Sequence, residues 1–220
     1  MKDFKNAMLN YKRSLTSDSN HFGSCIHLAK LLFTLKEFQR SIKYYKHAIK
    51  IDADNVQAQF GLANAIQKHS SNKEECIAPY QEVLKREPDH YRAITQLGIL
   101  YLDLKQYQKC AEQLKLALKI NAYYPKALVT MGELLFKTGN GEQAIKFFNQ
   151  ALKFEQNDVA AIIGLGNVYY QMEDSDNAIK YFRMAIQINN HNPDVHYNLG
   201  NSYYLAEKVD QAIYHYELSV

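Results

Sequence analysis

The sequence predicts an all-α fold in which antiparallel helix pairs stack one after another along the chain. Three observations lead to this prediction: a short pattern recurs about every 34 residues, its columns have helical spacing, and turn-like stretches separate them. A period of about 20 to 50 residues indicates stacked units, each of which buries the apolar face of its neighbour.

The first recurring pattern is a short apolar segment around a small residue. It reads SCIHLAKLL at 24–32, AQFGLANAI at 58–66 and VHYNLGNSY at 195–203. Leu or Met always precedes the small residue, and successive small residues are 34, 35, 34, 34 and 34 positions apart. These residues are Ala29, Ala63, Gly98, Gly132, Gly166 and Gly200. Six units in one register are not expected by chance.

The second pattern follows about twelve residues later and has three columns. The first column is small: Ala7, Ser41, Cys76, Cys110, Ala144, Ala178 and Ala212. Four residues on, the second is large: Tyr11, Tyr45, Tyr80, Leu114, Phe148, Phe182 and Tyr216. Three further on, the third is Ser14, Ala48, Val83, Ala117, Ala151, Ala185 and Ser219. Spacings of three and four place all three columns on one helix face.

Turn-like stretches at 35–38, 137–141 and 172–175 separate the two patterns. Gly and Asn, which the stretch at 137–141 contains, leave a helix at low cost. Each unit is therefore predicted to be a helix A, a turn and a helix B. Small columns let the two helices approach closely, and the large column fills the space beside them.

These residues resemble the tetratricopeptide repeat family, whose Leu-Gly-x-x-Tyr, Ala-x-x-x-Phe and Ala positions they follow along nearly the whole chain. The early Trp of the family is replaced in every unit, and its late Pro survives only as Pro88. The resemblance implies a right-handed superhelical solenoid of antiparallel helix pairs.

The repeat pattern also predicts how the chain is divided. The predicted division is a half repeat with helix B only at 1–21, then repeats at 22–55, 56–90, 91–124, 125–158 and 159–192, and a truncated repeat at 193–220. Solenoids usually need polar end units. The chain is therefore expected to be part of a longer protein, or to self-associate through its exposed ends.

The second repeat is irregular. It carries one extra residue in the polar loop 69–73 and Pro79 three residues after Cys76. An interior Pro costs about 3 kcal/mol through a lost hydrogen bond and a steric clash. Helix B is therefore predicted to be kinked, or to start late with Pro79 in its first turn.

Composition narrows the function. The net charge of +3 comes from interspersed charges with no basic tract, which argues against nucleic-acid binding. No apolar run of about 18 residues exists, so no membrane insertion is expected. The N-terminus does not look like a secretory signal. Three cysteines with no short spacing and no Asn-x-Ser/Thr sequon predict a reducing, cytoplasmic location. A location in the cilium or the nucleus would also be possible for the chain as a subunit of a complex.

No catalytic, cofactor or metal motif is found, so the chain is predicted to be no enzyme and to need no cofactor. Gly164-Leu165-Gly166 lacks the third Gly of a dinucleotide site and falls within a helix A column. Cys76 and Cys110 are expected to be buried and unpaired. Cys25 and His27 form only one pair of ligand types and point about 200° apart on a helix.

The resemblance implies a binding site, because A helices line the concave groove in which partners of this family usually lie. The predicted groove residues are Ile26, Lys30, Phe33, Phe60, Asn64, Arg92, Ile99, Lys126, Val129, Phe136, Ile163, Asn167, Tyr170, Tyr197, Asn198, Asn201 and Tyr204. Asn offers both a donor and an acceptor, so it can hold a peptide backbone. Alternatively, several of these aromatic residues only pack against the next helix and have no role in binding.

Two ligand modes known in the family match poorly. A clamp for the C-terminal carboxylate of chaperone tails would use Asn167 and Asn198, but Ile163 stands where Lys is required. The Asn ladder of O-linked N-acetylglucosamine transferase would need an Asn before every small residue, and only Asn198 is present. The remaining groove is apolar, dotted with Asn and mildly basic, and suits an extended or helical segment.

Three functions stay open at this stage. The chain is predicted foremost to be a scaffold that binds a peptide or helical segment of another protein in its groove. Alternatively it is a structural subunit of a larger complex that makes contacts through its ends or convex face. In a third interpretation it is the recruiting arm of an enzyme whose catalytic domain lies outside this segment.

Overall fold

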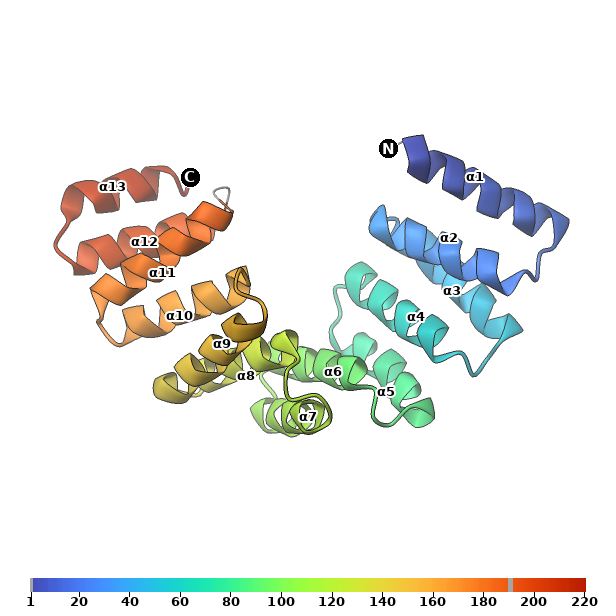
Figure 1. Ribbon diagram of the computed structural model, residues 1–220, viewed down its shortest axis with the longest axis horizontal. Coiled ribbons are helices and arrows are strands. Elements are labelled where there is room, and N and C mark those ends of the chain that lie inside the picture. Colours follow the sequence, from blue (N-terminus) through green and yellow to red (C-terminus); the bar gives the residue numbers. More distant parts are fainter. Residues whose placement is uncertain (1, 190–191) are drawn as a thin grey trace. The chain divides into compact units, whose positions relative to one another are not determined.

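A computed structural model describes residues 2–189 and 192–220. Within these ranges the chain forms thirteen α-helices and one short 3₁₀ helix and has no β-strand (Figure 1). It divides into two compact units, Met1–Gln106 and Tyr107–Val220. The predicted all-α solenoid of antiparallel helix pairs is thus confirmed.

Unit 1 contains six α-helices and the 3₁₀ helix. They are α1 (Lys2–Ser17), α2 (Phe22–Thr34), α3 (Phe38–Ile51), α4 (Val56–His69), η1 (Glu74–Cys76), α5 (Ile77–Arg86) and α6 (Tyr91–Asp103). Each α-helix packs against the next along the chain, and α2 also contacts α4. A helix that touches both its neighbour and the next helix but one is typical of a solenoid.

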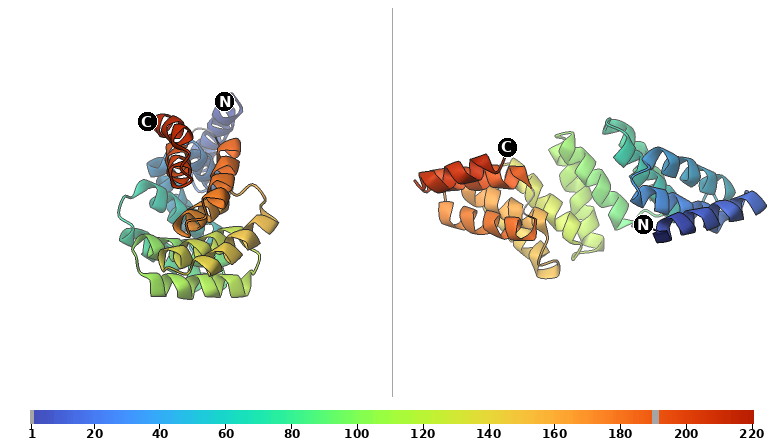
Figure 2. Two further views of the ribbon diagram at one scale, coloured as in Figure 1. Left: turned by 90° about the vertical axis from the view of Figure 1, so that its left-hand side faces the viewer. Right: turned by 90° about the horizontal axis from the view of Figure 1, so that it is seen from above.

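Unit 2 contains seven α-helices. They are α7 (Tyr107–Ile120), α8 (Pro125–Lys137), α9 (Gly141–Phe154), α10 (Val159–Gln171), α11 (Ser175–Ile188), α12 (Pro193–Leu205) and α13 (Val209–Glu217). Sequential helices lie side by side along the chain (Figure 2). Helix α10 also contacts both α8 and α12. In the predicted scheme α8, α10 and α12 are A helices. The exact repeat boundaries stay a prediction, because helix bounds alone do not define them.

The same turn joins helix A to helix B in five places. In the first, the N–H of Lys36 donates to Phe33 O at 3.0 Å and that of Glu37 to Leu32 O at 2.9 Å. This pair of bonds is a Schellman motif, which requires a residue with positive φ. The residues with positive φ are Lys36, Lys105, Gly139, Glu173 and Glu207. Only one of these five residues, Gly139, is a glycine, the residue type that favours positive φ.

The irregular second repeat lacks that turn. Helix α4 ends at His69, and Ser70 is extended with φ −82° and ψ 136°. The side chain of Asn72 accepts a hydrogen bond from the N–H of Glu74 at 3.0 Å and so starts η1. Helix α5 begins only at Ile77, which places Pro79 in its first turn. The prediction of a late start is confirmed.

Close packing at the small columns forms the core. In unit 2, Phe148 is 1% exposed, and a Cβ added to Gly164 would lie 2.4 Å from its ring. A Cβ on Gly132 would meet the same ring at 2.7 Å. One side chain of helix B therefore fills the space beside two A helices. The interpretation of Gly164-Leu165-Gly166 as a packing element fits this geometry.

Cys76 and Cys110 are buried and unpaired, as predicted, and so is Cys25. Burial raises the pKa of the Cys110 thiol to about 12, and the nearby Glu133 adds to the effect. Cys110 thus occupies its column as a small apolar side chain.

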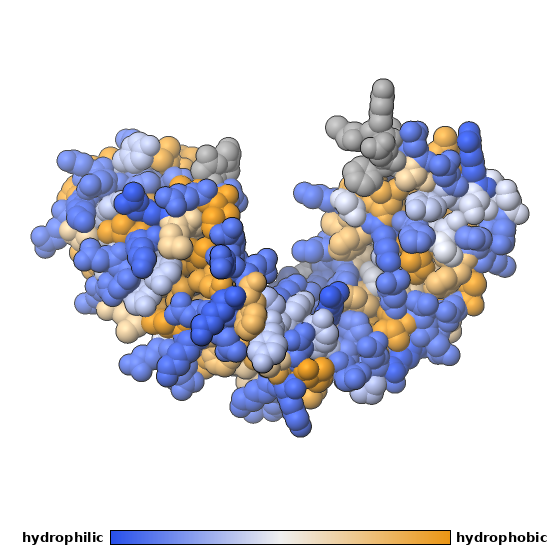
Figure 3. Space-filling view, in the orientation of Figure 1, coloured by the Kyte–Doolittle hydropathy of each residue, from blue (hydrophilic) through white to orange (hydrophobic). Residues whose placement is uncertain are grey.

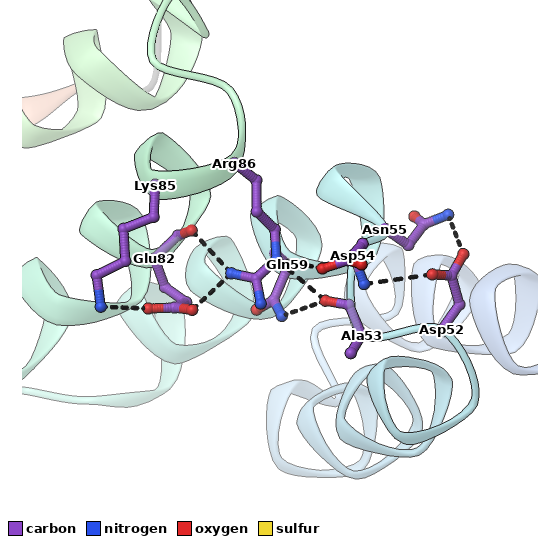
Figure 4. A network of polar contacts seen from close by, with 8 residues as sticks. All are labelled: Asp52, Ala53, Asp54, Asn55, Gln59, Glu82, Lys85 and Arg86. Atoms are coloured by element: carbon purple, nitrogen blue, oxygen red, sulfur yellow. Dashed lines mark hydrogen bonds and ion pairs between the residues drawn. The ribbon is translucent and has the colours of Figure 1, made fainter.

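A polar network ties helix α5 to the loop between α3 and α4 (Figure 4). The Arg86 side chain donates through Nε to Ala53 O at 3.1 Å and through a terminal nitrogen to Glu82 Oε1 at 2.5 Å. Gln59 donates to the same carbonyl at 3.3 Å. Hydrogen bonds from Lys85 and Arg86 lower the pKa of Glu82 from its ordinary 4.5 to about 2. Arg86, in the repeat that carries the insertion, is thus joined to a residue 33 positions earlier, in the preceding repeat.

We predict that Gly164→Ala destabilises the protein. Although Ala favours a helix by about 1 kcal/mol, its methyl group would overlap the fully buried Phe148 ring, and overpacking costs about 1–3 kcal/mol. Urea denaturation measures the change. The matched control is Gly23→Ala in α2, whose Cβ would meet only the exposed His21 ring at 3.3 Å. This variant should not lose stability, because it gains helix propensity without overpacking. Equal stability of the two variants would contradict this packing.

We also predict that Arg86→Ala lowers the melting temperature at pH 7. Because the folded-state pKa of Glu82 is depressed, its stabilisation is present above pH 4.5 and is lost as the pH falls toward 2. The difference in melting temperature between variant and wild type, measured by circular dichroism, should therefore become smaller over that range. Arg40→Ala, which removes a pair with Glu37 at the start of α3, is the control and should have a smaller effect. A difference in melting temperature that stays constant with pH would exclude stabilisation through the Arg86–Glu82 pair.

Candidate functional site

The A helices of unit 2 bring three predicted groove residues together. Phe136 of α8 and Ile163 and Asn167 of α10 line one pocket of about 440 Å³, here called the α8–α10 pocket. Gly164 and the ring of Phe148 also line it. Since Gly164 must be small for Phe148 to fit, the contact that builds the core also shapes this pocket.

A group of four tyrosines, the tyrosine cluster, continues this surface toward the C-terminus. It consists of Tyr170 of α10, Tyr197 and Tyr204 of α12, and Tyr216 of α13. Tyr170, Tyr197 and Tyr204 are 39%, 54% and 68% exposed. The rings of Tyr197 and Tyr216 lie 5.9 Å apart. Burial and the nearby phenols of Tyr197, Tyr170 and Tyr204 raise the pKa of Tyr216.

Asparagines lie among these aromatic residues. Asn198 Nδ2 donates to Asn167 Oδ1 at 3.2 Å and so links α12 to α10. The Tyr216 hydroxyl donates to Asn201 Oδ1 at 2.9 Å. Each amide has further donor or acceptor capacity after one such bond. The three asparagines are half-buried, which leaves part of each side chain accessible.

The charge of this surface is low. Helix α10 contains no Lys, Arg, Asp or Glu, and α12 contains only Asp194 in its first turn. Charged side chains enter at the α8 end, where Glu133 and Lys137 line the α8–α10 pocket. The surface over α10 and α12 therefore offers aromatic area and neutral hydrogen-bonding groups. Apolar side chains also reach the surface of both units between polar ones (Figure 3).

Unit 1 uses its corresponding positions mainly for internal packing. Phe60 contacts the rings of Tyr80 at 6.0 Å and His90 at 4.7 Å. Asn64 accepts a hydrogen bond from the Tyr80 hydroxyl at 2.7 Å. Phe33 packs edge-on against Phe38 at 5.4 Å. These observations favour the alternative in which such aromatics pack within the repeat.

Other predicted groove residues differ in exposure. Ile26 and Val129 are only 4% and 6% exposed. Including these two residues in an open groove was therefore wrong, because both pack into the core. The remaining predicted positions are half-buried or exposed: Lys30, Arg92, Ile99 and Lys126.

The sequence prediction missed Tyr216, which belongs to a helix B. A Tyr in the large column reaches the A-helix surface because its hydroxyl extends beyond the ring. The same arrangement occurs where Tyr80 donates to Asn64 and where Tyr216 donates to Asn201. In the sequence, the sign of this contact is a Tyr in the large column of helix B in the same repeat as an Asn one residue after the small residue of helix A. In the repeat of Asn167 the large residue is Phe182, so no such hydroxyl takes its amide.

A larger groove of about 730 Å³ lies elsewhere in unit 2. Helices α7, α8 and α9 line it, with Leu118, Leu128, Met131 and Phe147 among its apolar residues. None of the predicted groove residues lines it. Nothing in the structure specifies an occupant, so the groove is not assigned a role.

The described residues show no sign of two other classes of site. None of their helices combines the length and apolarity needed to cross a bilayer. Nor do His, Cys, Asp or Glu side chains within residues 2–189 and 192–220 gather in threes to hold a metal ion. The expectations of no metal, no cofactor and no enzymatic activity remain predictions.

Family comparisons agree with the repeat pattern. Models described as tetratricopeptide repeat match residues 22–55, 91–124 and 111–167, and one described as TPR repeat matches residues 166–206. The chain belongs to the tetratricopeptide repeat family. Its scaffold fold is therefore of a kind that is typically non-catalytic.

Solved tetratricopeptide structures are similar in fold. A chain of the APC/C hetero-tetramer Cut9–Hcn1 has a TM-score of 0.90 at 16% identity and matches 98% of this chain and 43% of that one. A tetratricopeptide repeat protein from Parabacteroides merdae has a TM-score of 0.79 at 16% identity over 99% of this chain and 86% of that one. YrrB, described as a TPR protein with an unusual peptide-binding site, has a TM-score of 0.58 at 19% identity over 82% of this chain and 92% of that one.

A relative in sequence is Protein CTR9 homolog of Arabidopsis thaliana. It is 29% identical over 119 residues, which are 52% of this chain and 11% of that protein. This tetratricopeptide chain thus spans about a tenth of its curated relative and less than half of the Cut9–Hcn1 chain.

Proposed function

We propose that the chain is a protein–protein interaction scaffold that binds a peptide segment of a partner across α8, α10 and α12. The observation that carries this proposal is the exposure of Tyr170, Tyr197 and Tyr204 on one uncharged surface. Tyr is enriched at interfaces because its ring supplies apolar area and its hydroxyl a hydrogen bond. A contiguous aromatic surface of this kind indicates a partner that covers it.

The asparagines supply the second part of the proposed recognition. Asn167 and Asn198 already face one another at 3.2 Å, so they form one polar site between two A helices. A peptide backbone could bind there through its own N–H and C=O groups, whatever its side chains. The α8–α10 pocket beside Asn167 would receive an apolar side chain, because Phe136 and Ile163 line it.

Similar proteins support a role within an assembly. The Cut9–Hcn1 chain belongs to a hetero-tetramer, and YrrB is described as having a peptide-binding site. A scaffold of this kind is proposed to act without catalysis or cofactor and in the cytoplasm. The three buried, unpaired cysteines support a reducing compartment.

We predict that the double substitution Asn167→Ala and Asn198→Ala weakens peptide binding at least about fivefold, because two hydrogen-bonding groups worth about 0.5–1.5 kcal/mol each are removed. Peptides selected from a random library on the wild-type protein serve as ligands in fluorescence anisotropy titrations. The melting temperature should not fall, since both side chains are half-buried at a surface.

Asn149→Ala, at an exposed position of α9, is the control and should leave affinity unchanged. Unchanged affinity in the double variant would rule out this polar site. A library that yields no ligand at all would contradict peptide binding as a whole.

One observation favours a second candidate function, assembly through the last helix. Ile179 of α11 is 8% exposed and belongs to the core that includes Val195 and Leu199 of α12. Ile213 occupies the equivalent position of α13, 34 residues later, and is 51% exposed. Val209 is 52% exposed on the same helix. We infer that this face of α13 is covered by a second copy of the chain.

Sedimentation velocity tests this inference. The wild-type chain should form a dimer whose population rises with concentration, and Ile213→Glu should shift it to monomer because a charge cannot be buried in an apolar contact without a partner. Glu142→Gln, an exposed change on α9, is the control and should not alter the distribution. A wild-type chain that remains monomeric at high concentration would exclude self-association through α13.

A further inference from the structure

The A helices of unit 2 present one aromatic residue each at equivalent positions. Phe136 of α8, Tyr170 of α10 and Tyr204 of α12 are 34 residues apart. Their helices are neighbours, since α10 contacts both α8 and α12. Packed helices lie about 8–10 Å apart. Rings at equivalent positions of packed helices are therefore expected to form a row with a repeat of roughly 8–10 Å.

This repeat matches one peptide conformation closely. A polyproline II helix has three residues per turn and rises about 3.1 Å per residue, so every third side chain returns to the same face after roughly 9 Å. A β-strand returns its side chains to one face every second residue, after about 6.6 Å. Successive same-face residues of a polyproline II segment would thus meet Phe136, Tyr170 and Tyr204 in turn.

Hydrogen bonding favours the same conformation. A polyproline II backbone makes no internal hydrogen bonds, so its carbonyl groups are open to outside donors. The side-chain amides of Asn167 and Asn198 can supply such donors beside the aromatic row, because their mutual hydrogen bond uses only one amide hydrogen of Asn198. An α-helical ligand already uses its carbonyls internally, so these groups would gain no backbone partner from it.

Charge sets a further condition on the ligand. Helices α10 and α12 carry one acidic and no basic residue, and α8 carries Lys126, Glu133 and Lys137. A strongly charged peptide would therefore find counter-charges only at the α8 end, and none along most of the surface. Proline rings, in contrast, pack on aromatic side chains with little loss of conformational freedom, because the segment is already extended.

We propose that α8, α10 and α12 bind an uncharged, proline-rich segment of a partner in the polyproline II conformation, one same-face residue per helix. The inference rests on the proposed peptide-binding function and specifies the ligand class for that same surface.

The test uses two labelled peptides of twelve residues. In the first, Pro-Pro-Gln is repeated four times, which leaves two faces of a polyproline II helix with proline only. In the second, Pro-Gln is repeated six times, which alternates Pro and Gln on every polyproline II face but leaves one face of a β-strand uniform. We expect the full chain to bind the first peptide at least about tenfold more tightly in anisotropy titrations.

Substitutions link binding to the aromatic row. Tyr170→Ala and Tyr204→Ala should each weaken binding of the first peptide at least about tenfold, as loss of an aromatic anchor does. Tyr204→Phe keeps the ring and should retain most of the affinity. The matched control is Tyr214→Ala, because Tyr214 is 58% exposed and lies about 200° around α13 from Tyr216. Melting curves confirm that each variant is folded.

Each contrary result has a distinct meaning. Preference for the second peptide, or binding of the first that is insensitive to Tyr170→Ala and Tyr204→Ala, overturns the polyproline II assignment. If neither peptide binds but library peptides without proline bind in a Tyr204-dependent manner, this inference fails and the proposed function stands. If no peptide of any kind binds, both fail.

Discussion

The close approach of neighbouring helices at the small columns is the constraint on which the rest of the structure depends. In unit 2, Gly132 and Gly164 leave room for the single ring of Phe148, and Gly166 does the same for Phe182. A larger residue at any of these positions would separate the helices. Because a solenoid has only neighbour contacts, each such junction must hold by itself. The spacing of the A helices, and with it the geometry of their outer surface, follows from these junctions.

The ring of helix B also decides what happens to the asparagine opposite it. Where the ring is Tyr80 or Tyr216, its hydroxyl bonds to Asn64 or Asn201 and holds that amide within the repeat. Phe182 has no hydroxyl, so the amide of Asn167 meets Asn198 of the next A helix instead. The choice between Phe and Tyr at a core position thus determines which polar groups remain directed toward a ligand.

Much of the fold could be predicted from the sequence, because the spacing of small and large residues is a direct record of helix packing. The late start of α5, which places Pro79 in its first turn, is predicted from the lost hydrogen bond and the steric clash of an interior proline. The site was less predictable. Ile26, Val129 and Tyr197 share one column, yet the first two are buried and Tyr197 is 54% exposed. Exposure depends on which side chains stand on the adjoining helices, and a column pattern does not contain that information. Nor do Lys36, Lys105, Glu173 and Glu207 reveal by residue type that they adopt positive φ.

The contrast between the units explains why the candidate surface lies in unit 2. In unit 1 the aromatic residues of A helices find partners nearby, as Phe60 does with Tyr80 and His90. Around α12 the corresponding residues are tyrosines, and Tyr204 remains 68% exposed. A phenylalanine there would expose a wholly apolar ring to water. A tyrosine exposes a ring of the same size, but its hydroxyl stays hydrogen-bonded to water. Tyrosine at such positions therefore gives a surface that is well solvated in the free protein and can still bind a partner through its rings. The absence of strong charge over α10 and α12 then leaves ring contact and hydrogen bonding, rather than electrostatic attraction, to select that partner.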